Sequence, residues 1–117
     1  MSEKQVTLAE TMQNIEQVFN QNPEPISGTN LIYQFNIKGE EEGTYQLHLQ
    51  EGQATVVEGN DGSPECTLTM SRNSFYKFLT GNLSGTVAFM TGKLKINGDI
   101  TKAMKLETIL KQYNLNE

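Results

Sequence analysis

The chain has 117 residues, of which 36% are hydrophobic and 20% charged, and it carries a formal net charge of −5 and a single cysteine. This apolar content is ordinary for a globular protein and too high for a disordered one. The acidic balance argues against a nucleic-acid partner, since phosphate contacts need clustered Lys and Arg. One cysteine excludes an internal disulfide, and no segment approaches the ~18 consecutive apolar residues of a membrane span.

We predict one domain over residues 1–117, with its core at about 6–113, because no Pro-, Gly- or Ser-rich linker divides the chain. The first residues lack the basic stretch and apolar run of a secretion signal. The last four residues, 114–117, match neither the peroxisomal nor the endoplasmic-reticulum address. We therefore expect a cytoplasmic location.

The first predicted element is an amphipathic helix. Thr7 and Glu10 have the spacing of a capping box, and apolar residues recur at helical intervals from Leu8 to Phe19. The helix should end before Pro23.

Four strands are expected next, because the hydrophobic period changes to two. Apolar and polar residues alternate within residues 31–38, 44–50, 54–57 and 66–71, and Gly- and Asn-containing turns separate these segments. Strands with one polar and one apolar face are typical of a mostly antiparallel sheet.

Two short helices follow. Residues 75–79 have helical spacing and Gly81 can end the helix, while a second helical piece at 86–91 is closed by Gly92. A last strand at 93–97 then leads into a last helix. This order predicts an α+β domain of two layers, in which helices cover one face of a five-stranded, mostly antiparallel sheet.

No catalytic residue is predicted. His48 alternates with two glutamines and should lie on the polar face of the sheet, whereas Cys66 is in register with Leu68 and Met70 and should face the core. A nucleophile and its base must lie within hydrogen-bond reach, and opposite sheet faces prevent this.

No metal or cofactor site is predicted either. The consecutive carboxylates of residues 40–42 lie at a hairpin tip, where they point in different directions and stay hydrated. Gly92-Lys93 resembles part of a phosphate loop, but Val87 replaces the first glycine and Leu94 replaces the Ser/Thr.

Three segments together resemble the sterol carrier protein 2 family. They are residues 66–70, residues 75–81, and the run Ala-Phe-Met-Thr-Gly-Lys-Leu-Lys-Ile-Asn-Gly at 88–98. The resemblance continues through residues 103–106 and reaches back more weakly to Phe35. The chain departs from common members in lacking tryptophan and a peroxisomal tripeptide.

The resemblance implies a non-enzymatic carrier with an apolar tunnel between the sheet and the helices, and we expect the carrier to be a monomer. The implied ligands are sterols, fatty acids, acyl-CoA or phospholipids. Phe89 and Met90 are expected beneath the sheet. The predicted ligand-binding residues are Ile15, Phe19, Phe75, Phe78, Leu79, Val87, Phe89, Met90, Ile100, Met104 and Ile109.

Two questions stay open. The same apolar side chains could fill a solid core, in which case the domain, with its tunnel closed, would be a structural or protein-interaction module. A second open point is the uneven charge: residues 1–70 carry eleven acidic and two basic side chains, and residues 71–117 carry three acidic and seven basic ones.

Lysines dominate the C-terminal part of this charge pattern. We expect these lysines to meet an anionic headgroup or membrane surface; the alternative is that they only balance the acidic first half. The lysines concerned are Lys93, Lys95, Lys102, Lys105 and Lys111.

Overall fold

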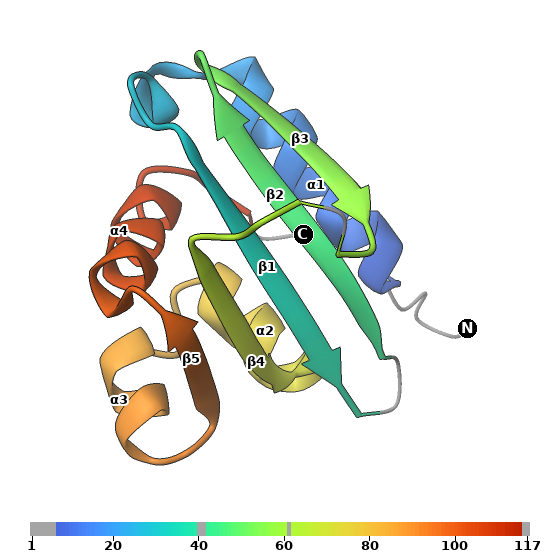
Figure 1. The fold of residues 1–117 in the computed structure, drawn as a ribbon, viewed down its shortest axis with the longest axis vertical. Helices are drawn as coiled ribbons and strands as arrows, with labels where there is room; N and C mark the ends of the chain where they lie inside the picture. The colour runs from blue at the N-terminus through green and yellow to red at the C-terminus, as the bar shows by residue number, and fades with distance from the viewer. Residues whose placement is uncertain (1–6, 40–41, 61, 116–117) are drawn as a thin grey trace.

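The computed structural model describes residues 7–39, 42–60 and 62–115 (Figure 1). The five strands are β1 (Leu31–Lys38), β2 (Gly43–Gln50), β3 (Gln53–Glu58), β4 (Cys66–Ser71) and β5 (Leu94–Gly98). The helices are α1 (Leu8–Gln21), α2 (Arg72–Leu79), α3 (Gly85–Met90) and α4 (Ile100–Leu110), with a short 3-10 turn, η1, at Glu24–Ile26. The 3-10 turn is the one element that the sequence pattern did not predict.

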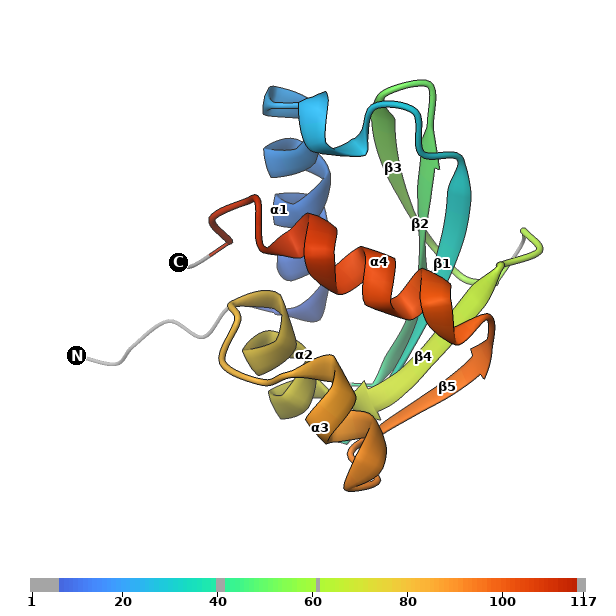
Figure 2. The same ribbon diagram turned by 90° about the vertical axis from the view of Figure 1, so that its left-hand side faces the viewer.

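The strands form one mixed sheet in the order β3-β2-β1-β4-β5. Neighbouring strands run antiparallel except for β1 and β4, which are parallel. Figure 2 shows the helices gathered on one face of this sheet. The prediction of an α+β domain with a mostly antiparallel sheet is therefore confirmed.

Helix α1 begins with the predicted capping box. The Glu10 backbone N–H donates to Thr7 Oγ1 (3.1 Å), and the Thr7 N–H donates to Glu10 Oε1 (3.0 Å). The helix then buries its apolar stripe against the sheet, with Met12 and Phe19 fully enclosed. Such a stripe supplies most of the stability of a helix on a globular domain.

The polar side of α1 protects the outer edge of β3. The side-chain amide of Asn20 donates to the Ala54 carbonyl and accepts from the Ala54 N–H, both at 2.8 Å. One turn earlier, Glu16 accepts a hydrogen bond of 3.1 Å from the Val56 N–H. These contacts occupy backbone groups that a free edge strand would offer to another chain.

The core lies between the sheet and the helix layer. Tyr33 and Phe35 on β1 are buried completely or nearly so, and the ring of Phe35 packs against Phe75 of α2 with 5.3 Å between centroids. At the other end of the layer, Phe19 of α1 stacks on Tyr113 at 4.3 Å. The two aromatic pairs thus tie α2 to the sheet and α1 to the segment after α4.

The outer face of the sheet is less open than the alternation suggests. Gln46 on β2 is fully buried, because the backbone at Gly62 lies over it. Its amide nitrogen donates to the Gly62 carbonyl (3.0 Å) and to Gln34 Oε1 (2.9 Å), while its oxygen accepts from the Gly62 N–H (3.0 Å). One buried amide therefore fixes the β3–β4 connection against the sheet.

Candidate functional site

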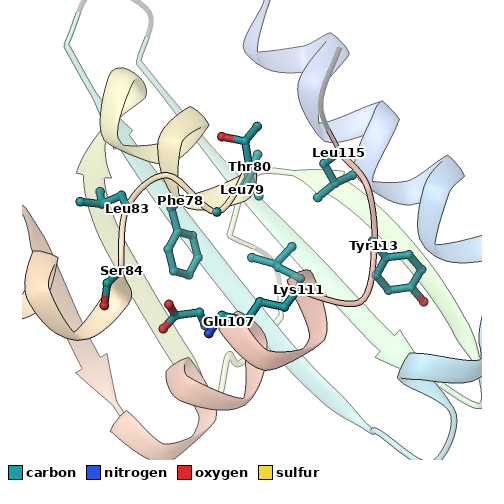
Figure 3. A pocket seen from close by; sticks show the side chains of 11 residues that line it. Phe78, Leu79, Thr80, Leu83, Ser84, Glu107, Lys111, Tyr113 and Leu115 are labelled. Carbon is teal, nitrogen blue, oxygen red and sulfur yellow. The ribbon is translucent and has the colours of Figure 1, made fainter.

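A cavity of about 350 Å³ opens in the helix layer (Figure 3). It lies between α2, the connection from α2 to α3, helix α4 and the segment that follows α4. Figure 3 shows the Phe78 ring pointing across this space toward Glu107 of α4. The lining residues are Phe78, Leu79, Thr80, Gly81, Leu83, Ser84, Glu107, Leu110, Lys111, Tyr113 and Leu115.

The hydrogen-bonding groups that line the cavity are partly engaged with the backbone. Glu107 Oε2 accepts a hydrogen bond of 3.2 Å from the Gly85 N–H at the start of α3. The Thr80 hydroxyl donates to the Tyr76 carbonyl at 3.0 Å. Ser84 Oγ accepts from the Val87 N–H at 3.4 Å. These three side chains serve the ends of α2 and α3, and together with Lys111 they give the cavity a partly polar wall beside the apolar side chains of Phe78, Leu79 and Leu83.

The cavity borders the apolar layer beneath the helices. Phe78 and Leu79, which form its α2 wall, are only 4% and 6% exposed and belong to the same cluster as the sheet residues. Tyr113 forms another wall, and its hydroxyl donates to the Asn22 carbonyl at 2.6 Å. Leu115 is buried there as well.

The predicted ligand-binding residues fall into two groups. The first group is buried beneath the helices and consists of Ile15, Phe19, Phe75, Phe78, Leu79 and Ile109. Phe78 and Leu79 of this group line the cavity. The prediction missed Leu83 and Leu115, which lie in irregular segments where no hydrophobic period marks them.

The second group lies at the surface. The exposed fractions are 53% for Val87, 41% for Phe89, 77% for Met90 and 45% for Ile100. Met104 is half-buried beside α3, where its sulfur accepts a hydrogen bond of 3.6 Å from the Thr86 hydroxyl. A role of these residues in ligand binding stays a prediction.

The expectation that Phe89 and Met90 lie beneath the sheet is wrong. Helix α3 has six residues and buries Gly85 and Ala88 instead. Its Schellman ending explains the orientation, because the Lys93 N–H bonds to the Ala88 carbonyl at 2.9 Å and Gly92 adopts φ = 82°. This turn aligns Ala88 with the start of β5 and leaves Met90 outside.

The lysines do not all share one face. Lys93, Lys95, Lys105 and Lys111 are exposed and Lys102 is half-buried. On β5, the alternating residues Leu94 and Ile96 pack in the core, so Lys95 points to the outer face of the sheet, away from the helices.

The described residues bring together no nucleophile and base. Burial, followed by the negative charge of Asp99, raises the pKa of the Cys66 thiol to about 11, so the thiol stays protonated and unreactive at neutral pH. His48 lies on the outer face and hydrogen-bonds through Nε2 to Gln46 Oε1 at 3.0 Å. The predicted separation of His48 and Cys66 on opposite faces is confirmed.

Two further features concern the described ranges 7–39, 42–60 and 62–115. Within them, no three His, Cys, Asp or Glu side chains are placed to share a metal ion. In the same ranges, no helix has the length and apolar character needed to cross a bilayer.

Known proteins that resemble this chain in sequence and in fold point to the same family. Hydroxysteroid dehydrogenase-like protein 2 of Xenopus tropicalis is 42% identical over 108 residues, which are 92% of this chain and 25% of that protein. The chain thus spans about a quarter of the length of that relative. Several solved structures share the fold, among them two sterol carrier proteins. Sterol carrier protein 2 from Yarrowia lipolytica, in its apo form, has a TM-score of 0.76 and 29% identity, with 99% of this chain and 100% of that chain covered.

The second structure is sterol carrier protein 2 from Aedes aegypti in complex with the C16 fatty acid palmitate. Its TM-score is 0.68 with 22% identity, and the match covers 97% of this chain and 100% of that chain. The model of the SCP-2 sterol transfer family matches residues 12–111, which include every described helix and strand apart from the first turn of α1. The chain belongs to the SCP-2 sterol transfer family.

Proposed function

We propose that the protein binds long apolar lipids and carries them without chemical change. The observation that carries this proposal is the cavity of about 350 Å³ in the helix layer, which adjoins the buried apolar layer at Phe78 and Leu79. This volume falls within the range of ~300–1,000 Å³ that small-molecule sites occupy. An acyl chain would enter there and extend between α2, α4 and the sheet.

The family and one neighbour of the same fold support this class of ligand. The Aedes aegypti carrier is described in complex with palmitate. The buried apolar cluster that includes Phe78 and Leu79 also contains Met12 and Met70, and unbranched methionines adapt readily to different shapes. We propose a fatty acyl chain as the ligand class, with the headgroup left open.

We also propose that the chain itself is not an enzyme. The name of the Xenopus relative refers to a dehydrogenase, but this chain spans a quarter of that protein. The protonated thiol of Cys66 and the distant His48 offer no acid–base chemistry beside the cavity. The proposal therefore concerns binding and transfer alone.

A closed structural module is the second candidate. It is favoured by the dense packing of Met12, Phe19, Tyr33 and Phe75, all with essentially no exposed surface. In this case the helices would not part to admit a ligand, and the protein would serve a protein partner.

Native mass spectrometry of the protein purified under gentle conditions distinguishes the two candidates. The carrier should retain a co-purified lipid or take up palmitate as a stoichiometric adduct. A mass that stays equal to that of the apo chain at excess palmitate supports the closed module.

A further inference from the structure

The exposed apolar side chains of the protein gather at one place. Among the described residues, the large apolar side chains that are exposed are Val87, Phe89, Met90 and Ile100. All of them belong to α3 or to the first residue of α4. Met90, at 77% exposed, has almost no cover from the rest of the molecule.

Three of these side chains, Val87, Met90 and Ile100, lie together with Met104 along the α3–α4 seam. Ile100 and Met104 are neighbours on α4 at i and i+4, and Met104 contacts Thr86 of α3 at 3.6 Å. Thr86 and Met90 are again i, i+4 neighbours, and Val87 stands three residues before Met90. We call this surface the seam patch: Val87, Met90, Ile100 and Met104.

Lysines outnumber the carboxylates in the segment that carries the seam patch. Lys93 follows α3 directly, and Lys105 is exposed beside Met104. Residues 93–111 hold five lysines against two acids, Asp99 and Glu107, which accept hydrogen bonds from the Thr101 N–H (3.0 Å) and the Gly85 N–H (3.2 Å). An apolar strip with a cationic border complements the surface of an anionic bilayer.

The charge distribution orients this face. Residues 1–70 carry eleven acidic and two basic side chains, whereas residues 71–117 carry three acidic and seven basic ones. Figure 1 shows α1, β2 and β3 on the opposite side of the molecule from α3, α4 and β5. An anionic surface therefore repels the α1 side and attracts the seam patch.

We propose that the seam patch is the docking surface for an anionic lipid bilayer, with Val87, Met90 and Ile100 inserted at the headgroup level and Lys93 and Lys105 against the lipid phosphates. This inference rests on the proposed function, because a carrier must meet a membrane to exchange its lipid. It goes beyond that function by giving the exposed residues of α3 a task outside the ligand site.

The absence of tryptophan from the chain makes insertion directly measurable. A Met90→Trp variant should show a blue-shifted emission and protection from aqueous quenchers when mixed with vesicles containing roughly one-third phosphatidylserine. The matched control, Gln17→Trp on the exposed side of α1, should show no change. An unchanged spectrum of the Met90→Trp variant, or an equal shift in the control, would overturn the proposal.

Charge variants test the cationic border. Lys105→Glu should lower partitioning onto these vesicles about tenfold, and Lys95→Glu, which changes the net charge equally but lies on the outer sheet face, should lower it much less. Equal losses in the two variants would show that net charge, and not this face, drives association. A blue shift of the Met90→Trp variant that grows with protein concentration in the absence of vesicles would assign the patch to a second copy and overturn bilayer docking.

Binding of a soluble fluorescent fatty acid, measured without vesicles, separates this proposal from the proposed function. The lysine variants should bind the probe like the wild type. If the wild type fails to bind the probe, the carrier function fails, whereas normal probe binding without vesicle association refutes only the docking surface.

Discussion

The hydroxyl of Tyr33, on the central strand β1, donates a hydrogen bond of 2.7 Å to the backbone carbonyl of Lys102 in α4. Tyr33 is fully buried, so this bond joins the sheet to the helix layer through the core. Burial, followed by the nearby Cys66 and Glu65, raises the pKa of the phenol well above its ordinary value of 10.0. The hydroxyl therefore remains a donor throughout the physiological range.

Replacing Tyr33 with Phe should lower the free energy of unfolding by about 1 kcal/mol, because the carbonyl loses one partner while the ring keeps its packing. Urea unfolding measures this loss, and hydrogen exchange should show faster opening of the first turns of α4. Tyr113→Phe is the control, since its bond to the Asn22 carbonyl is exposed and should contribute less. Equal losses in both variants would contradict the importance of the buried bond.

Cys66 predicts a loss of stability at alkaline pH. Its folded pKa of about 11 lies above the ordinary value of 9.0, so the unfolded chain releases the proton first as pH rises. The stabilisation is complete below pH 9 and should fall between pH 9 and 11 by roughly 2–3 kcal/mol in total. Urea unfolding across this range should show the decline, and the difference between wild type and Cys66→Ala should shrink over the same interval. A constant difference would contradict the raised pKa.

Two glycines of the 88–98 run should differ sharply in their tolerance of alanine. Gly98 has φ = 101°, and a Cβ there would lie 2.6 Å from the Glu65 carbonyl oxygen, so Gly98→Ala should cost roughly 2–5 kcal/mol. Gly92 has φ = 82° but open space around it, so Gly92→Ala should cost only about 1 kcal/mol. Urea midpoints of the two variants test the order, and a larger loss at Gly92 would contradict it.

Much of the fold could be predicted because alternation and helical spacing assign each side chain to a face. The strand patterns placed Cys66 inward and His48 outward, and the Thr7–Glu10 spacing predicted the first capping box. These features depend on residues close in sequence, so local periodicity contains them.

The orientation of α3 could not be predicted in this way. Val87, Ala88, Phe89 and Met90 are successive apolar residues, which point in all directions around a six-residue helix. The choice of Ala88 as the buried residue depends on packing against β5 and α4. Periodicity cannot supply this information, because the helix has no polar stripe on that turn.

The cavity could not be predicted from the sequence for a related reason. Two of its walls, residues 80–84 and 111–115, lack a regular period and meet only because the chain returns to α2 after α4. The buried Gln46 is a similar case, since its partner Gly62 lies in a connection that folds back over the sheet. Such contacts are decided by the path of the chain and not by local pattern.

The α1–β3 contact predicts a role for Asn20 in shielding the edge of β3. Asn20→Ala removes two hydrogen bonds of 2.8 Å to Ala54 and exposes the edge of β3. We expect a loss of about 1–2 kcal/mol in unfolding free energy, faster hydrogen exchange at the Ala54 amide, and concentration-dependent association in sedimentation. Gln17→Ala, on the exposed side of α1, is the control and should change none of these. Protection of the Ala54 amide that survives in Asn20→Ala would contradict this account.

Displacement of a fluorescent fatty acid by unlabelled palmitate, in the wild type and in two tryptophan variants, tests lipid carriage most directly. Burial of twelve methylenes offers about 10 kcal/mol before association costs, so we predict saturable binding in the micromolar range or tighter. Leu83→Trp, which narrows the cavity, should weaken binding at least about tenfold, while Thr108→Trp, on the exposed side of α4, should leave it unchanged. Saturable binding that Leu83→Trp weakens and Thr108→Trp does not would place the acyl chain in this cavity. Absence of displacement at millimolar palmitate, or equal affinities in all three proteins, would contradict the account.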